Sequence, residues 1–401
     1  MKSQITRSKC LGLIGALLVG PSLSGSAAEI FDDWLAFSIH ARAVAGVTTG
    51  DYDELALHAH DPNQDVTLQG LELGVNLNLN EYIQGFAAVN TFLDTDDELD
   101  AEWEEGFLKL ANLPGGFEVR GGRYLNRFGT QNNVHLHGWS FVDSDVLVPS
   151  FLGDEGLVTE GGELTWLFER DQYLSAISAS FGNAVTHDHH GHGHDEEEDD
   201  DDEDDHEHGH GGEDALFSDE VFTVRWLNRW NQNDFHQHEV GFNYAEGDND
   251  YGRDTTIWSG DYTYQWRERG LEEGGRSLRV VAEAFYRDVE WMDEHEDDIE
   301  TGSTDHWGAS LAAIFGFCED VEAGIRIGWL EGAEGLVDGD EEVFGVEERW
   351  RYSAMVTQYF DIGSDTSGLA RLQFNYDDLP EGDEQSIVFQ IGFDWGGPEI
   401  R

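Results

Sequence analysis

The chain has 401 residues, with 84 Asp and Glu against 22 Lys and Arg, and a formal net charge of −62 at pH 7. A chain this acidic does not bind nucleic acid or an anionic surface non-specifically. No nucleophile–base pair stands out that would indicate an enzyme. The 23 Phe, 13 Trp and 12 Tyr are unusual for so charged a sequence and must be explained by its fold.

Residues 1–28 have the pattern of a secretory signal peptide. Basic residues precede an apolar run at 11–19, and a small-residue stretch ends at Ala28. The run is too short to span a bilayer, so we expect cleavage before Glu29. The mature chain, 29–401, then keeps a single cysteine, Cys318, and can form no intramolecular disulfide.

From residue 34 onward, apolar and polar residues alternate with period two. In 71–79, for example, Leu and Val at odd positions alternate with polar residues and Gly at even ones. This pattern predicts strands with one apolar and one polar face, and no convincing amphipathic helix interrupts them. We count about sixteen strands, near residues 34–48, 66–80, 82–93, 103–111, 117–124, 161–169, 173–182, 220–229, 237–246, 255–267, 277–290, 305–317, 321–330, 348–360, 367–377 and 386–395.

The connections between these strands alternate in length along the chain. Most even-numbered strands are followed by short turns and the odd-numbered ones by long acidic loops, which a soluble β-sandwich would not show. The sequence therefore predicts an all-β fold, a transmembrane antiparallel β-barrel of about sixteen strands with short periplasmic turns and long acidic extracellular loops. We expect it in the outer membrane of a Gram-negative bacterium, surrounded by lipopolysaccharide, and compatible with a homotrimer.

An insertion rich in His, Asp and Glu occupies the fourth long loop, 183–216. From His187 to Asp214 it has eight histidines, fifteen carboxylates and no apolar side chain, so we expect it to be disordered. Imidazole and carboxylate groups bind divalent metals, and an acidic loop alone would not need eight histidines. We predict weak binding of Zn²⁺ or other divalent cations, with no tightly bound cofactor, by His187, His189, His190, His192, His194, His206, His208 and His210.

Other histidines fall on the same side of the predicted barrel. His58 and His60, His135 and His137, and His295 and His306 are placed in extracellular loops, which with the insertion makes 14 of the 17 histidines. The third long loop, 125–160, is less acidic and contains its own apolar residues, so it must pack on something. We predict that it folds into the barrel as a constriction and brings His135 and His137 to the pore as half of a metal site.

Arginines show the opposite distribution, inside the strands and on their polar faces. A charge facing lipid at mid-depth costs about 2–4 kcal/mol, so these residues should line the pore: Arg42, Arg225, Arg229, Arg279, Arg287, Arg326, Arg351 and Arg371. They would either pair with carboxylates of the lumen, such as Glu72, Glu283 and Glu322, or form a ladder that sets ion selectivity.

The segments 121–129 (GGRYLNRFG) and 153–157 (GDEGL), followed by Glu163-Leu164, resemble the porin family that includes the phosphate-selective porins. The similarity is strongest to the branch of zinc-regulated outer-membrane porins with a His/Asp-rich loop, and it covers 117–170. It implies a passive outer-membrane channel connected with zinc supply and transfers no binding residues. Phosphate selectivity based on lysine is not supported, because the mature chain has only Lys109.

Three hypotheses for the function follow. In the first, a passive porin carries an extracellular His/acid-rich loop that concentrates divalent metal cations for diffusion into the periplasm. In the second, a general or anion-preferring porin uses its acidic loop only to bridge Ca²⁺ or Mg²⁺ in lipopolysaccharide, and unpaired arginines would dominate its lumen. In the third, a plugged barrel anchors a metal-buffering surface protein.

Overall fold

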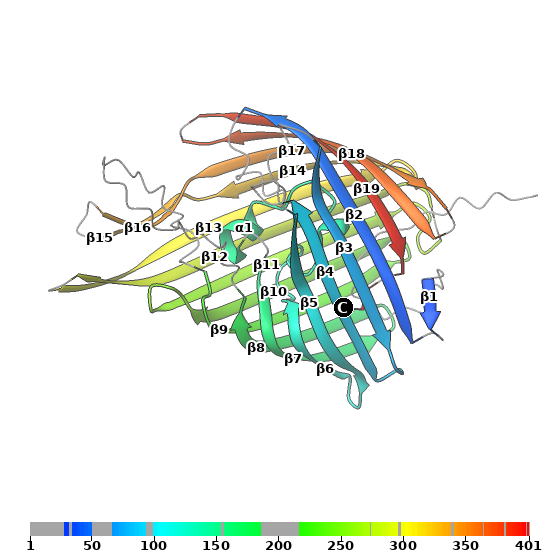
Figure 1. The fold of residues 1–401 in the computed structure, drawn as a ribbon, viewed down its shortest axis with the longest axis horizontal. Helices are drawn as coiled ribbons and strands as arrows, with labels where there is room; N and C mark the ends of the chain where they lie inside the picture. The colour runs from blue at the N-terminus through cyan, green and yellow to red at the C-terminus, as the bar shows by residue number, and fades with distance from the viewer. Residues whose placement is uncertain are drawn as a thin grey trace, which may run out of the picture.

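The computed structural model describes residues 28–31, 34–49, 66–93, 99–153, 156–185, 216–272, 274–295, 298–337, 341–363, 365–380, 382–397 and 399–400. Sixteen of the strands in its main sheet form a closed antiparallel barrel, in which β19 pairs with β2 (Figure 1). The predicted fold class and strand number are confirmed. The short strand β1 (Ala28–Phe31) pairs with β2 outside this ring, and β15 (Ala333–Val337) and β16 (Glu341–Val346) form a separate hairpin.

The barrel strands follow one another in chain order. Their bounds are β2 Leu35–Thr48, β3 Thr67–Asn78, β4 Ile83–Leu93, β5 Leu99–Leu113, β6 Phe117–Leu125, β7 Val158–Arg170, β8 Tyr173–Ala184, β9 Glu220–Asn233, β10 His236–Asp248, β11 Asp254–Arg267, β12 Ser277–His295, β13 Asp298–Gly316, β14 Val321–Leu330, β17 Arg349–Asp361, β18 Thr366–Asp378 and β19 Glu384–Gly396.

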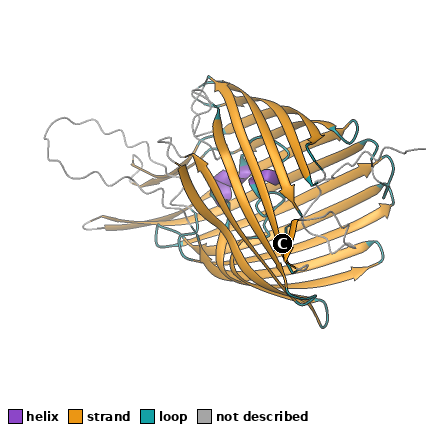
Figure 2. Cartoon of the chain, turned by 45° about the vertical axis from the view of Figure 1, so that its right-hand side comes forward, coloured by secondary structure: helices purple, strands orange, loops and turns teal. Residues whose placement is uncertain are grey.

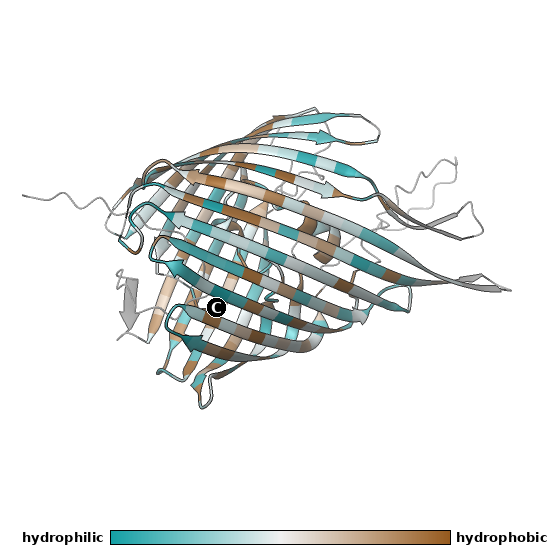
Figure 3. Ribbon diagram, turned by 180° about the vertical axis from the view of Figure 1, so that it is seen from behind, coloured by the Kyte–Doolittle hydropathy of each residue, from teal (hydrophilic) through white to brown (hydrophobic). Residues whose placement is uncertain are grey.

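The apolar face of each strand points outward. In β19, Phe389 and Ile391 are nearly half exposed, whereas Val388 and Gln390 between them are 1% exposed. Figure 3 shows this alternation of apolar and polar residues along the strands. Near the loop end, four aromatic residues on neighbouring strands stand side by side: Tyr244, Trp258, Tyr286 and Trp307. An apolar outer belt with an aromatic girdle on a closed barrel places the protein in the outer membrane of a Gram-negative bacterium.

β12 and β13 extend further toward the loop end than the sequence predicted, so His306, at the predicted start of its strand, lies well inside β13. β12 and β13 have 19 residues each and pair along their whole length, from Ser277 opposite Gly316 to His295 opposite Asp298. The placement of His306 in a loop was wrong, because it lies within β13 and is 0% exposed. The strands continue because backbone pairing does not require the apolar pattern that marks the membrane belt.

The segment between β6 and β7 folds into the barrel. It contains a 3-10 turn, Leu136–Gly138, and one short helix, α1 (Leu147–Leu152), which lies inside the ring of strands (Figure 2). Among the described residues, no helix is long and apolar enough to cross a membrane. We call residues 126–153 and 156–157 the inner loop. Most of its buried apolar side chains pack on the inner wall in one cluster, which includes Phe128, Leu147, Phe151, Ile257, Phe285 and Leu330, and Phe141 packs in a second one with Ile314 and Met355.

Candidate metal site inside the barrel

The inner loop is fastened to the wall by buried polar contacts. Asp143 is fully buried, and its carboxylate accepts hydrogen bonds from Arg326 at 2.5 Å, from Gln373 at 2.6 Å and from Asn375 at 3.1 Å. Arg371 donates to two loop carbonyls, those of Trp139 and Phe141, at 3.0 and 2.9 Å. Since a buried charge is tolerated only with partners, these contacts fix the path of the loop.

All eight predicted pore arginines have polar partners. Four of them pair with carboxylates: Arg225 with Asp261, Arg229 with Glu239, Arg326 with Asp143 and Arg351 with Asp377. Three others reach the inner loop, namely Arg279 at the Ser140 hydroxyl, Arg287 at the Ser150 carbonyl and Arg371. The eighth, Arg42, contacts both a carboxylate and a loop carbonyl.

The carboxylates named from the sequence take other partners. Glu283 accepts hydrogen bonds from the Thr130 backbone and hydroxyl, and Glu322 accepts one from the Tyr359 hydroxyl at 2.7 Å. Glu72 contacts the histidines of the inner loop. Many of these arginines therefore bind the inner loop instead of the carboxylates named from the sequence.

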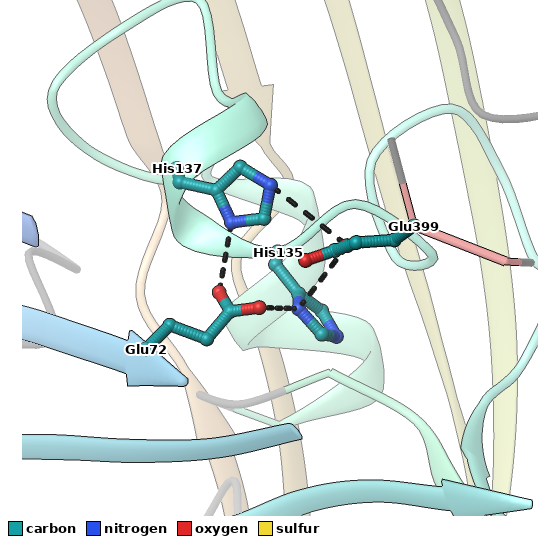
Figure 4. Close-up of side chains that lie close together, drawn as sticks. All are labelled: Glu72, His135, His137 and Glu399. Atoms are coloured by element: carbon teal, nitrogen blue, oxygen red, sulfur yellow. Dashed lines mark hydrogen bonds and ion pairs between the residues drawn. The ribbon is translucent and has the colours of Figure 1, made fainter. Parts of the chain in front are cut away.

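His135 and His137 meet Glu72 of β3 and Glu399 of the C-terminal segment (Figure 4). His135 Nδ1 lies 2.7 Å from one oxygen of Glu72, and His137 Nδ1 lies 2.8 Å from the other. Glu399 Oε2 is 3.9 Å from His135 Nδ1 and 3.8 Å from His137 Nε2. One ligand atom from each residue can be chosen so that all four lie within 4.8 Å of one another.

This donor set fits a divalent transition metal. Two imidazoles and two carboxylates are the ligand types that Zn²⁺ takes, with bonds of about 2.0–2.2 Å, so its ligand atoms stand about 3.3–3.6 Å apart in a tetrahedron. The four ligand atoms lie within 4.8 Å of one another, so they would have to approach by at most about 1.5 Å to reach that spacing.

Neighbouring groups orient the histidines. Glu105 Oε2 lies 3.0 Å from His135 Nε2, so the imidazole presents Nδ1 to Glu72, and such carboxylate–histidine pairs are typical partners of metal ligands. His40 stacks on His137 with ring centroids 3.7 Å apart. Arg42 donates to the His137 carbonyl at 2.8 Å and fixes the backbone there.

The protonation state of His137 also suits a metal ligand. Burial lowers the pKa of His137, and the nearby carboxylates of Glu72 and Glu399 only partly oppose this effect. Its imidazole is therefore neutral at pH 7, which is the form that binds metals.

The structure thus brings together some of the residues predicted from the sequence and not others. His135 and His137 lie together, His135 immediately before the 3-10 turn and His137 within it. The eight histidines of the insertion, His58 and His60, and the signal peptide up to residue 27 lie outside the described residues. Glu399 was not among the residues predicted from the sequence, although the segment that continues past the last strand and carries the apolar Ile400 could have indicated it.

Comparisons with known proteins agree with the barrel. No family model matches the chain. An uncharacterized protein of Aquifex aeolicus is 33% identical over 106 residues, or 25% of this chain, and the match spans 22% of that curated relative.

Among solved structures, the chain is similar to the outer membrane channel DcaP of Acinetobacter baumannii, with a TM-score of 0.52 and 9% identity over 90% of this chain and 97% of that one. It is also similar to an anion-selective porin from Comamonas acidovorans, with a TM-score of 0.51 and 9% identity over 90% and 99% of the two chains. These structural neighbours are outer-membrane porins, and at this identity the likeness establishes the fold alone.

Proposed function

We propose that the protein is a passive outer-membrane porin, without enzymatic activity, that admits divalent metal cations and Zn²⁺ in particular. The observation that carries this proposal is the grouping of His135, His137, Glu72 and Glu399 inside the barrel. Isolated surface histidines have many uses, but two imidazoles and two carboxylates converging within a lumen make a cation site. The porin-like fold supports a passive channel.

Transport would proceed in two stages. The carboxylates of the insertion raise the local cation concentration electrostatically, and its eight histidines hold the ions weakly and multivalently. Ions then diffuse to the site on the inner loop and onward to the periplasm. Weak binding suits a conduit, because a tight site would retain its cargo.

A second candidate, an anion-preferring porin, is suggested by the name of the Comamonas neighbour. It would need arginine charge that is available to permeating anions. Arg225, Arg326 and Arg351 instead face buried carboxylates at 2.5–3.0 Å, which weakens this reading.

Calorimetry tests the metal proposal. Zn²⁺ and Ca²⁺ are titrated into the intact chain, into a variant with the eight insertion histidines changed to Ser, and into that variant with His135→Ala and His137→Ala added. We expect Zn²⁺ binding to fall at each step while Ca²⁺ binding stays nearly constant. Equal Zn²⁺ uptake by all three proteins, with Ca²⁺ bound as well as Zn²⁺, would show that the histidines do not contribute and that the insertion attracts cations only through its carboxylates.

A further inference from the structure

The chain continues past its last barrel strand and turns into the lumen. β19 ends at Gly396, which lies opposite Ser38 at the short-turn end of β2. The Ile400 N–H then donates to Asn76 Oδ1 at 2.7 Å, and its side chain packs against a cluster on strands β4 to β6: Phe86, Ala88, Phe107 and Tyr124. The Glu399 side chain is 5% exposed. We call the described residues after Gly396, namely Gly397, Glu399 and Ile400, the tail.

The candidate metal site joins this tail to two other parts of the molecule. Glu72 belongs to the barrel wall, His135 and His137 to the inner loop, and Glu399 to the tail (Figure 4). Glu399 lies 3.7 Å from His40, 3.9 Å from His135 and 3.8 Å from His137. An ion bound by all four ligands would replace these long contacts with coordination bonds.

Charge couples the tail to the metal. His135 already lies near three carboxylates, with Glu72 at 2.7 Å, Glu105 at 3.0 Å and Glu104 at 3.6 Å. Docking the tail adds Glu399 to this buried acidic neighbourhood, where like charges repel strongly. A divalent cation offsets that repulsion, so metal binding and tail docking favour one another.

We propose that the tail is a metal-dependent gate: an ion held by Glu72, His135, His137 and Glu399 keeps the tail docked inside the barrel and narrows the channel. Loss of the ion lets the tail leave toward the periplasm. The pore then conducts less when metal is plentiful and more when it is scarce. This inference rests on the metal site of the proposed function.

Thermodynamic linkage gives a quantitative test. Two quantities are compared. The first is the factor by which saturating Zn²⁺ reduces the population of undocked tail. The second is the Zn²⁺ dissociation constant of a chain truncated after Gly396 divided by that of the full-length chain, and linkage requires the two to be equal. Both are measured in the background with the eight insertion histidines changed to Ser and an untagged C-terminus. The undocked population is followed by the release of C-terminal residues by a metal-independent carboxypeptidase, with mass spectrometry as the readout. The rate of release tracks that population when docking is fast.

We expect Zn²⁺ to slow the release, and the slowing to match the affinity ratio. Glu399→Gln should lose this protection, whereas Glu331→Gln, at an exposed position after β14, should keep it. In planar bilayers, Zn²⁺ should lower the conductance of the full-length pore and leave the truncated pore unchanged.

The outcomes separate the two proposals. If Zn²⁺ binds through His135 and His137 but changes neither tail release nor conductance, the gate is refuted and the metal site stands. If His135→Ala with His137→Ala leaves Zn²⁺ binding unchanged in this background, the metal site fails, and the gate fails with it.

Discussion

Removing the Asp143 carboxylate should release the inner loop from the barrel wall. In Asp143→Ala, Arg326 loses its carboxylate partner at 2.5 Å, whereas Arg351 keeps Asp377 at 2.7 Å. Breaking a buried ion pair costs about 3–5 kcal/mol, because one charge stays behind without compensation. The sixteen strands hold one another by backbone pairing, so the protein relieves this cost by releasing the loop and hydrating Arg326 rather than by unfolding.

The released loop should be visible in single-channel recordings. A loss of about 3–5 kcal/mol lowers the ratio of docked to released loop by roughly 10²- to 4 × 10³-fold. We expect larger and noisier conductance levels in planar bilayers and faster proteolysis within the inner loop. Asp143→Asn, which keeps one oxygen acceptor, should be intermediate, and Glu169→Ala at an exposed position should behave as wild type. Wild-type conductance together with wild-type protease resistance in Asp143→Ala would show that Asp143 does not anchor the loop.

Three other predictions follow from the barrel and its insertion. Deleting 186–214 should leave heat-modifiable gel migration and channel activity intact, because the segment has no apolar side chain before Ala215 to anchor it; loss of folding would make it structural. Zn²⁺ held by the insertion should dissociate as pH falls from about 6.5 to 5, since protonated imidazole cannot bind metal, whereas carboxylates alone would hold ions to lower pH. Phe389→Arg, in the outer belt, should cost about 2–4 kcal/mol in a denaturation series in lipid, and Gln385→Arg, on the same face at the strand end, much less.

The strands could be read from the sequence because the membrane imposes one rule on all of them. Lipid outside and a polar interior force alternation at every position, so a strand such as 386–395 is recognisable without knowledge of its neighbours. The rule weakens where strands leave the membrane. There β13 carries polar residues on both faces from Ser303 to His306, so its start was predicted near 305 instead of Asp298 and His306 was assigned to the adjoining loop.

The candidate site could be predicted only in part. The His-x-His spacing identified His135 and His137 because both residue types are metal ligands. Glu72 was recognised only as a polar residue of the lumen, since 63 positions separate it from His135 and pairing depends on how the inner loop folds. Glu399 depends on the path of the tail after β19, which no local pattern specifies.

The seam between β2 and β19 has a consequence for assembly. Arg42 on β2 donates to Asp394 on β19, 352 positions away, and to the His137 carbonyl of the inner loop. One side chain therefore connects the first and last barrel strands with the inner loop. Such distant contacts carry the largest loop-closure entropy and form late in folding. β19 must therefore first pair with β2 through backbone hydrogen bonds alone. The contact between Arg42 and the inner loop then stabilises a barrel that has already closed. Opening the cylinder again would require undoing both.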